Sequence, residues 1–129
     1  MSAVVRRLRG RVAGGRGDLA HWMTVYAEAY QRVTGLRLFP GSLDVALDHE
    51  YHVPEDRLRI EPADLGGRVG MHLGPCTIGG RRGFFLRTDQ NEAGTGHPGR
   101  HVVEVAVAVH LDQTRALADG DMVEIVVGG

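Results

Sequence analysis

The stretch VVEVAVAVHL, residues 102–111, decides the fold class of this chain. Apolar residues fill every second position from Val103 to Leu111, and the positions between hold Glu104, Ala106, Ala108 and His110. Side chains alternate between the two faces of a strand, so this period of two predicts a long β-strand with one face in the core.

Other segments of the chain repeat the signal. Residues 68–73, 76–78, 82–86 and 122–127 are predicted as strands separated by Gly-Gly and Asp-Gly turns, after an N-terminal strand. Only residues 19–34 show the helical spacing of apolar residues in steps of three and four, and Gly35 follows as a C-terminal cap. One principal helix among six or more strands predicts a compact, mainly β barrel, and residues 1–129 suit a single domain.

Composition is that of a globular protein outside the membrane. Hydrophobic residues make up 43% and charged residues 24% of the chain. No apolar run approaches the roughly 20 residues of a spanning helix, and the N-terminus lacks the apolar centre of a signal peptide, so a cytoplasmic protein with no membrane partner is expected. Cys76 is the only cysteine, which excludes an intramolecular disulfide and a Cys-rich zinc site; we expect it in the core.

The charge balance and the absence of lysine exclude several kinds of binding site and of catalytic chemistry. The 15 cations are all arginine and face 16 acidic residues, so a nucleic-acid partner bound through phosphate attraction is not expected. Without lysine there is no Walker-type phosphate loop and no Schiff base on a lysine. The same bias is typical of a high-GC genome, which favours a bacterial source. The four arginines near the N-terminus, between positions 6 and 11, are expected to be solvated.

A hydroxyl and a carboxylate stand side by side in LFPGSLDVAL, residues 38–47. Ser42 and Asp44 lie at i and i+2, and in a strand they point to the same face. Oxygen ligands of this kind suit Mg²⁺, which takes one or two protein ligands and completes its shell with water and phosphate. The alternative is that both are ordinary residues after a Pro-Gly turn.

Two loops could add binding groups. The glycine-rich stretch at residues 10–22, a turn between an N-terminal strand and the helix, could present successive N–H groups to a phosphate, or could be an exposed hairpin. Residues 87–101 form a long polar loop that carries Thr95, His97 and His101, and loops of this kind are often functional. Pro98 and Gly99 argue against a helical zinc site at the two histidines.

The order of these features is more specific than any one of them. Gly15-x-Gly17-Asp18, then PGSLDV at 40–45, then Val103-Glu104-Val105 and Asp119-Gly120-Asp121 resemble the CTP-dependent riboflavin kinase family, best known from archaea. The resemblance covers nearly the whole chain. Its most specific part is PGSLDV, which is similar to the family's P-G-T-L-N-V.

The resemblance implies a six-stranded cradle-loop barrel that transfers the γ-phosphoryl of CTP to the 5′-hydroxyl of riboflavin, giving FMN with Mg²⁺. It implies that Ser42 and Asp44 hold the metal, and that Thr95 and Glu104 contact the flavin. Glu104 is also the candidate to orient or deprotonate the acceptor hydroxyl. Nucleotide contacts would come from two segments, comprising Gly15, Arg16, Gly17 and Asp18, and Val109, His110, Leu111 and Asp112. A monomer or small homo-oligomer is expected.

The chain departs from the family pattern at two positions beside the implied nucleotide site. Leu19 stands where the family has glycine, and Asp112 where it has arginine. Two alternatives therefore stay open: a related phosphotransferase that uses another alcohol or another nucleotide, and a barrel that binds a ligand without catalysis.

Overall fold

The computed structural model of the protein describes residues 5–13, 19–38, 43–67, 69–95, 99–107 and 120–128, without the side chains of residues 19 and 20. The described strands are β1 (Arg6–Ala13), β2 (Leu43–Leu47), β3 (Leu58–Ile60), β4 (Met71–Ile78), β5 (Arg81–Thr88), β6 (Val102–Val107) and β7 (Met122–Val127). The helices are α1 (Leu19–Val25), α2 (Ala27–Thr34), α3 (Asp89–Glu92) and a 3₁₀ turn, η1 (Pro62–Leu65).

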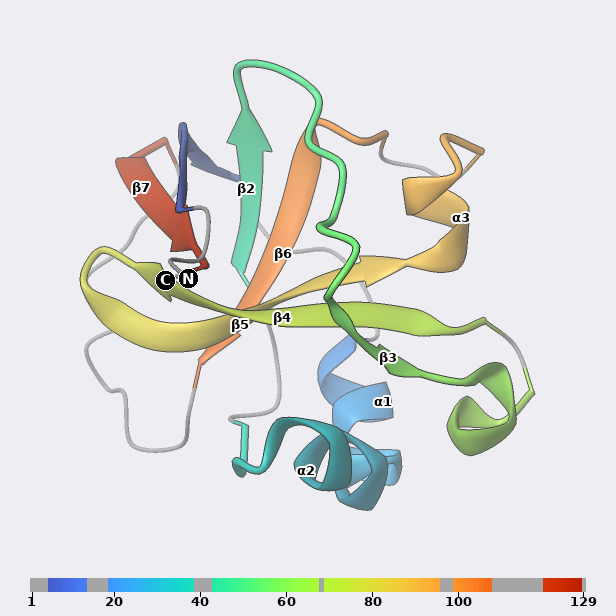
Figure 1. The fold of residues 1–129 in the computed structure, drawn as a ribbon. Coiled ribbons are helices and arrows are strands. Elements are labelled where there is room, and N and C mark those ends of the chain that lie inside the picture. Colours follow the sequence, from blue (N-terminus) through green and yellow to red (C-terminus); the bar gives the residue numbers. More distant parts are fainter. Residues whose placement is uncertain are drawn as a thin grey trace.

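Six of the strands close into a barrel. The hydrogen-bonded order is β4-β5-β6-β2-β1-β7, and β7 pairs in turn with β4, so the ring is complete and every pairing in it is antiparallel. β3 adds to the free edge of β4 outside the ring. Helices α1 and α2 lie together below the barrel in Figure 1, and α3 lies at its right. The predicted six-stranded, mainly β barrel is confirmed.

Two apolar cores sit on opposite faces of the barrel wall. The inner core includes Val103, Val105 and Val107 of β6, as the alternation predicts, together with the buried Cys76. Burial raises the pKa of the Cys76 thiol to about 12, which fits a core residue. The second core lies under the helices and includes Ala106 on the other face of β6. The rest of the predicted strand, residues 108–111, lies outside the described residues.

The predicted helix is two helices. The C-terminal cap at Gly35 is confirmed: its φ is 74° and its N–H bonds to the carbonyl of Gln31. The prediction of one uninterrupted helix was wrong, because Tyr26 leaves helical geometry at φ −109° and ψ 31°. The β-branched pair Thr24-Val25 precedes the break and weakens helix propensity there.

β4 is one strand where the sequence predicted two. It pairs with β5 along its whole length, while its other edge pairs with β3 up to Leu73 and with β7 from Cys76. Pro75 falls between these two pairings, where a strand residue without an N–H is tolerated. The Gly-Gly turn after β4 is confirmed, since Gly79 and Gly80 both have positive φ.

The polar loop at 87–101 is shorter and more ordered than predicted. β5 continues to Thr88, whose hydroxyl accepts a hydrogen bond from the N–H of Asn91 and so starts α3. The expectation for the N-terminal arginines is confirmed: they lie on β1, where every second residue is buried and the arginines are exposed.

Candidate functional site

Two carboxylates face each other on neighbouring strands. In the antiparallel pairing of β2 with β6, Asp44 lies directly opposite Glu104. Directly opposed residues share a face and have Cβ atoms about 4.5–5.5 Å apart. Both side chains are partly buried. The structure therefore brings together the residue predicted to bind metal and the residue predicted to contact the acceptor, although they are distant in sequence.

The pair lies on the outer, helix-covered face of the barrel wall. Glu104 is two residues from Ala106 and directly opposite Leu86, and both of these belong to the core under the helices. Tyr30 of α2, only 3% exposed, packs in the same core. Burial and the nearby charge of Glu104 raise the pKa of Tyr30 to about 12, so the phenol remains protonated beside the carboxylates.

Burial also affects the acid on β2. Desolvation raises the pKa of Asp44 above its usual value. Like charges at directly opposed positions in a sheet repel each other. A bound cation would lower the cost of keeping Asp44 and Glu104 ionised.

The donor chemistry of the pair fits Mg²⁺, which accepts hard oxygen ligands and commonly takes one or two carboxylates from a protein. Within the described ranges no cluster of three or more His, Cys, Asp and Glu side chains could hold a metal ion, so an all-protein cage is not formed there. Asp44 can contribute one ligand of a site completed by water and phosphate.

The described strand ends show where the other predicted segments join the barrel. β1 ends at Ala13, opposite Asp44; β2 begins at Leu43, opposite Val105; β7 begins opposite Arg11. The segments that follow β1, precede β2 and follow β6 are therefore attached to neighbouring strands at the same end of the barrel, next to the carboxylate pair.

Most of the predicted binding residues fall in those segments and lie outside the described residues: Gly15, Arg16, Gly17, Asp18, Ser42, Val109, His110, Leu111 and Asp112. His97 and Asp119 also lie outside them. Thr95 is described. It follows α3 and is exposed, with its N–H and its hydroxyl directed to the carbonyl of Gln90 at 3.0 and 3.3 Å.

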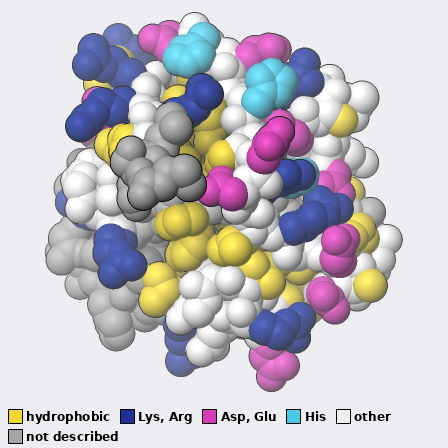
Figure 2. Space-filling model, in the orientation of Figure 1, with side chains coloured by type: hydrophobic (Ala, Val, Ile, Leu, Met, Phe, Trp, Pro, Cys, Tyr) yellow, Lys and Arg dark blue, Asp and Glu magenta, His cyan; other side chains and the backbone are white. Residues whose placement is uncertain are grey.

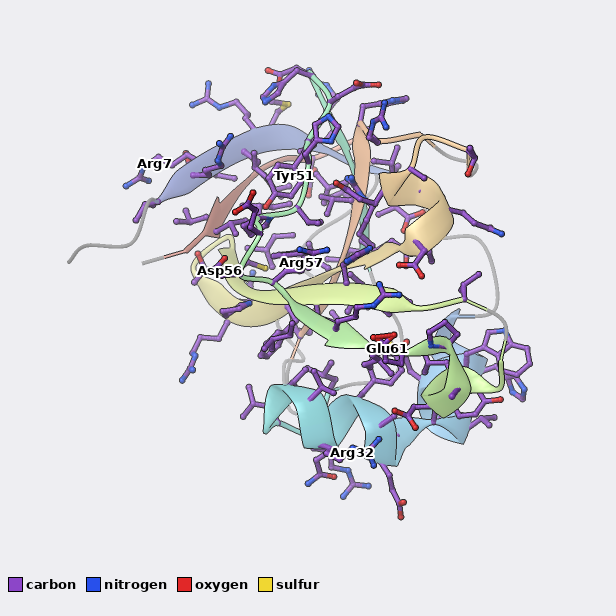
Figure 3. The ribbon with its side chains drawn as sticks, turned by 45° about the vertical axis from the view of Figure 1, so that its right-hand side comes forward. Arg7, Arg32, Tyr51, Asp56, Arg57 and Glu61 are labelled. Carbon is purple, nitrogen blue, oxygen red and sulfur yellow. The ribbon has the colours of Figure 1, made fainter. Side chains whose placement is uncertain are left out.

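A second polar cluster, which the sequence analysis missed, anchors the start of α3. Asp89 accepts hydrogen bonds from both terminal nitrogens of Arg59 and from the N–H of Gly70. Nε2 of His72 lies 2.9 Å from the same carboxylate, while Nδ1 accepts at 3.1 Å from Nε of Arg57, which is labelled in Figure 3. Hydrogen bonding to Arg59 lowers the pKa of Asp89, and burial lowers the pKa of His72.

A third cluster holds the end of the same helix. The side chain of Arg87 is fully buried and donates to Glu92 at 2.9 Å and to the carbonyl of Tyr51 at 2.6 Å. It also donates to the carbonyls of Arg100 and Val102, so one guanidinium joins four segments. Both clusters connect segments that are distant in sequence. The sequence could not predict them, because nothing around a single Arg or Asp shows which distant residue it will bind.

Charged side chains of both signs lie on the face shown in Figure 2, where arginines, acidic residues and histidines are all present. The exposed arginines of β1 lie together on one strand. None of the helices in the described ranges is both long enough and apolar enough to cross a membrane.

The fold and the site together define a class: a closed six-stranded antiparallel barrel with an acidic pair under its helices. No family model matches the chain. The chain is similar over most of its length to curated archaeal proteins named riboflavin kinase. It is 34% identical to the riboflavin kinase of Pyrobaculum arsenaticum over 94% of this chain, and 30% identical to that of Thermococcus kodakarensis over 92%.

The lengths of these relatives differ. The chain spans 60% of the Pyrobaculum protein and 57% of the Thermococcus protein. It spans 91% of the riboflavin kinase of Staphylothermus marinus, to which it is 24% identical. The relatives named here are archaeal and lend no support to the expected bacterial source.

Proposed function

We propose that this chain is a CTP-dependent riboflavin kinase, which transfers the γ-phosphoryl of CTP to the 5′-hydroxyl of riboflavin and releases FMN. The observation that carries the proposal is Asp44 facing Glu104 on adjacent strands. These are the positions that the family resemblance assigns to the metal and to the acceptor. Similarity to named riboflavin kinases over more than nine-tenths of the chain supports the same assignment.

Mg²⁺ would be held by Asp44 and Ser42, and would neutralise charge on the nucleotide phosphates. The half-buried carboxylate of Asp44 suits this role, because a cation offsets the desolvation that raises its pKa. The remaining nucleotide contacts are proposed for the segments at residues 15–18 and 109–112. They follow β1 and β6, at the end of the barrel that carries the pair.

Glu104 would orient the acceptor hydroxyl and take its proton. Glu104 lies opposite Asp44, so an acceptor bound by Glu104 would lie beside the proposed metal ligand. Such positioning is a large part of catalysis in phosphoryl transfer. Thr95 would contact the flavin from the loop after α3. That loop is braced by Arg87, which bonds to Glu92 on one side and to the carbonyl of Arg100 on the other.

A second candidate function is phosphoryl transfer on the same scaffold with a different nucleotide or a different alcohol as substrate. Asp112 places an anion where the resembling family has a cation, and Leu19 replaces a glycine. These two changes favour a phosphotransferase whose nucleotide or alcohol differs from CTP or riboflavin.

The deciding experiment is to incubate the purified protein with riboflavin, Mg²⁺ and either CTP or ATP, and to separate FMN from riboflavin by chromatography with fluorescence detection. We expect FMN with CTP and little with ATP. If FMN forms with ATP and not with CTP, the phosphate donor is ATP and the CTP part of the proposal is wrong. If neither nucleotide gives FMN, the riboflavin kinase proposal is wrong, and a panel of other alcohols tests the second candidate.

Replacing Asp44 tests the metal ligand. Asp44→Ala is expected to lower kcat by about 10²–10³-fold, because it removes a ligand of the ion that stabilises the transferring phosphoryl group. Asp44→Asn is the matched control: the family has asparagine at this position, so this variant should retain most of the activity. Equal activity in wild type and Asp44→Ala, with both folded by circular dichroism, would exclude Asp44 as a ligand.

A further inference from the structure

Tyr30 brings a hydroxyl group into the core under the helices, next to the acidic pair. It lies on α2 and is 3% exposed. The same core contains Ala106, two residues beyond Glu104 on the same face of β6, and Leu86, directly opposite Glu104 on β5. The ring of Tyr30 therefore lies between α2 and the part of the barrel wall that carries Glu104.

The hydroxyl of Tyr30 has no hydrogen-bond partner among the described residues, and yet it is not sealed in the core. Three unpartnered side-chain atoms in the described ranges are fully enclosed: the hydroxyl of Tyr51 and Nε of Arg87 and of Arg100. The Tyr30 hydroxyl is not one of them, so it keeps surface that a bound molecule can reach. Buried tyrosine hydroxyls usually have a hydrogen-bond partner, and phenylalanine would fill the same space without that requirement. The hydroxyl is therefore available to a ligand.

Glu104 acts on this hydroxyl through its charge. Together with burial, the carboxylate raises the pKa of Tyr30 to about 12, and the two groups are not hydrogen-bonded to each other. The phenol is therefore protonated at neutral pH, and it has an O–H to donate beside the carboxylate that we assign to the acceptor.

The backbone of α2 holds Tyr30 at a constant position. The N–H of Tyr30 donates to the carbonyl of Tyr26 at 3.3 Å, and its carbonyl accepts from the hydroxyl of Thr34 at 2.7 Å. The left-handed cap at Gly35 ends the helix just beyond. Because the ring is also packed in the core, the hydroxyl is preorganised for a ligand.

We propose that the Tyr30 hydroxyl donates a hydrogen bond to a hydroxyl oxygen on the polyol chain of the acceptor, next to the hydroxyl that Glu104 orients. The inference rests on the proposed function and deepens it. A neutral O–H donor suits a neutral hydroxyl oxygen, whereas the phosphates of the nucleotide are assigned to the cation on Asp44. Tyr30 is then a specificity-determining residue, because it favours a flavin that carries a hydroxylated chain over one that lacks it.

Flavin binding to the full chain tests the inference. Quenching of flavin fluorescence measures the affinity of wild type and of Tyr30→Phe for riboflavin and for lumiflavin, which has a methyl group in place of the ribityl chain. We expect Tyr30→Phe to weaken riboflavin binding by about 3–10-fold, the usual loss for one neutral hydrogen bond, and to leave lumiflavin binding unchanged. Unchanged riboflavin affinity in Tyr30→Phe, or an equal loss for both flavins, would overturn the inference.

The wild-type protein separates this inference from the proposed function. If wild type binds riboflavin and forms FMN, and Tyr30→Phe does the same with equal affinity, the kinase proposal stands and only the role of Tyr30 is wrong. If wild type binds neither flavin and forms no FMN, the kinase proposal fails and the role of Tyr30 fails with it.

Tyr26→Phe is the matched control. The Tyr26 hydroxyl lies against Gly66, the cap of η1, so this variant should bind both flavins as wild type does. Tyr30→Phe should melt no lower than wild type, because its hydroxyl has no partner among the described residues. A lower melting temperature would show that the hydroxyl holds the fold, and would overturn its assignment to the acceptor.

Discussion

The acidic pair on β2 and β6 and the charged clusters around α3 use the same residue types in opposite ways. Around α3 each charge meets its opposite: Asp89 with Arg59, and Glu92 with Arg87. On the barrel wall the facing residues, Asp44 and Glu104, carry the same sign. The clusters at α3 lower the pKa of Asp89, whereas burial raises the pKa of Asp44.

We expect this difference to separate the groups that hold the fold from the groups proposed to bind a ligand. A carboxylate with a lowered pKa is stabilised by the folded state, and one with a raised pKa is a cost to it. Evolution tolerates such a cost where function needs it, which is why perturbed carboxylates cluster at functional sites. The pH dependence of stability in matched variants can therefore tell the two regions apart.

The largest effect is expected from removing the buried cation. Arg87→Met should lower the free energy of unfolding by about 3–5 kcal/mol, because it leaves a carboxylate and three carbonyl groups without their donor. Urea denaturation measures the change. Arg7→Gln is the control at the exposed Arg7–Glu124 pair and should cost less than about 1 kcal/mol. Equal losses in the two variants would show that Arg87 is not a structural anchor.

A smaller loss of stability should follow in Asp89→Asn, about 1–2 kcal/mol at pH 7 after allowing for its partial exposure. The folded state lowers the pKa of Asp89, so its contribution is present above the unfolded pKa and is lost as pH falls through the folded pKa. The difference between variant and wild type should hold from about pH 7 to 5 and shrink below about pH 4.

Asp64→Asn is the matched control for Asp89→Asn, since Asp64 pairs with Arg32 at the surface at 3.6 Å. Thermal unfolding at each pH measures both variants. A difference for Asp89→Asn that does not change with pH would contradict an electrostatic role for this carboxylate.

The smallest expected change in the free energy of unfolding is a gain instead of a loss. Asp44→Asn should raise the free energy of unfolding at pH 7 by up to about 1 kcal/mol in the absence of metal, because it removes a half-buried negative charge. The raised pKa of Asp44 means that its contribution is favourable at low pH and is lost as pH rises through the folded pKa.

The gain in Asp44→Asn should therefore vanish below about pH 4, near the unfolded pKa of aspartate. Calorimetry in EDTA across that range measures it. A variant less stable than wild type at pH 7 would place Asp44 among the structural carboxylates, with Asp89.

Local pattern was a good guide where the structure is itself local. The alternation in β6 predicted which valines enter the barrel, and Gly35 was correctly identified as a helix cap. Local pattern failed at Tyr26, where the predicted helix is interrupted. It also failed at Pro75, where β4 continues: this edge of the strand pairs with β3 before Pro75 and with β7 after it, so no N–H is needed at the proline. The short β3 and α3 were missed, because three or four residues give too little periodicity to recognise.

By itself the sequence determined the mainly β barrel, the exclusion of lysine chemistry, and the candidate residues Asp44 and Glu104. Only the tertiary structure decided that these two residues face each other across β2 and β6. The physical reason is register. Periodicity fixes which face of a strand a side chain occupies, whereas the pairing of strands distant in sequence fixes which side chains meet, and that pairing depends on the packing of the whole barrel.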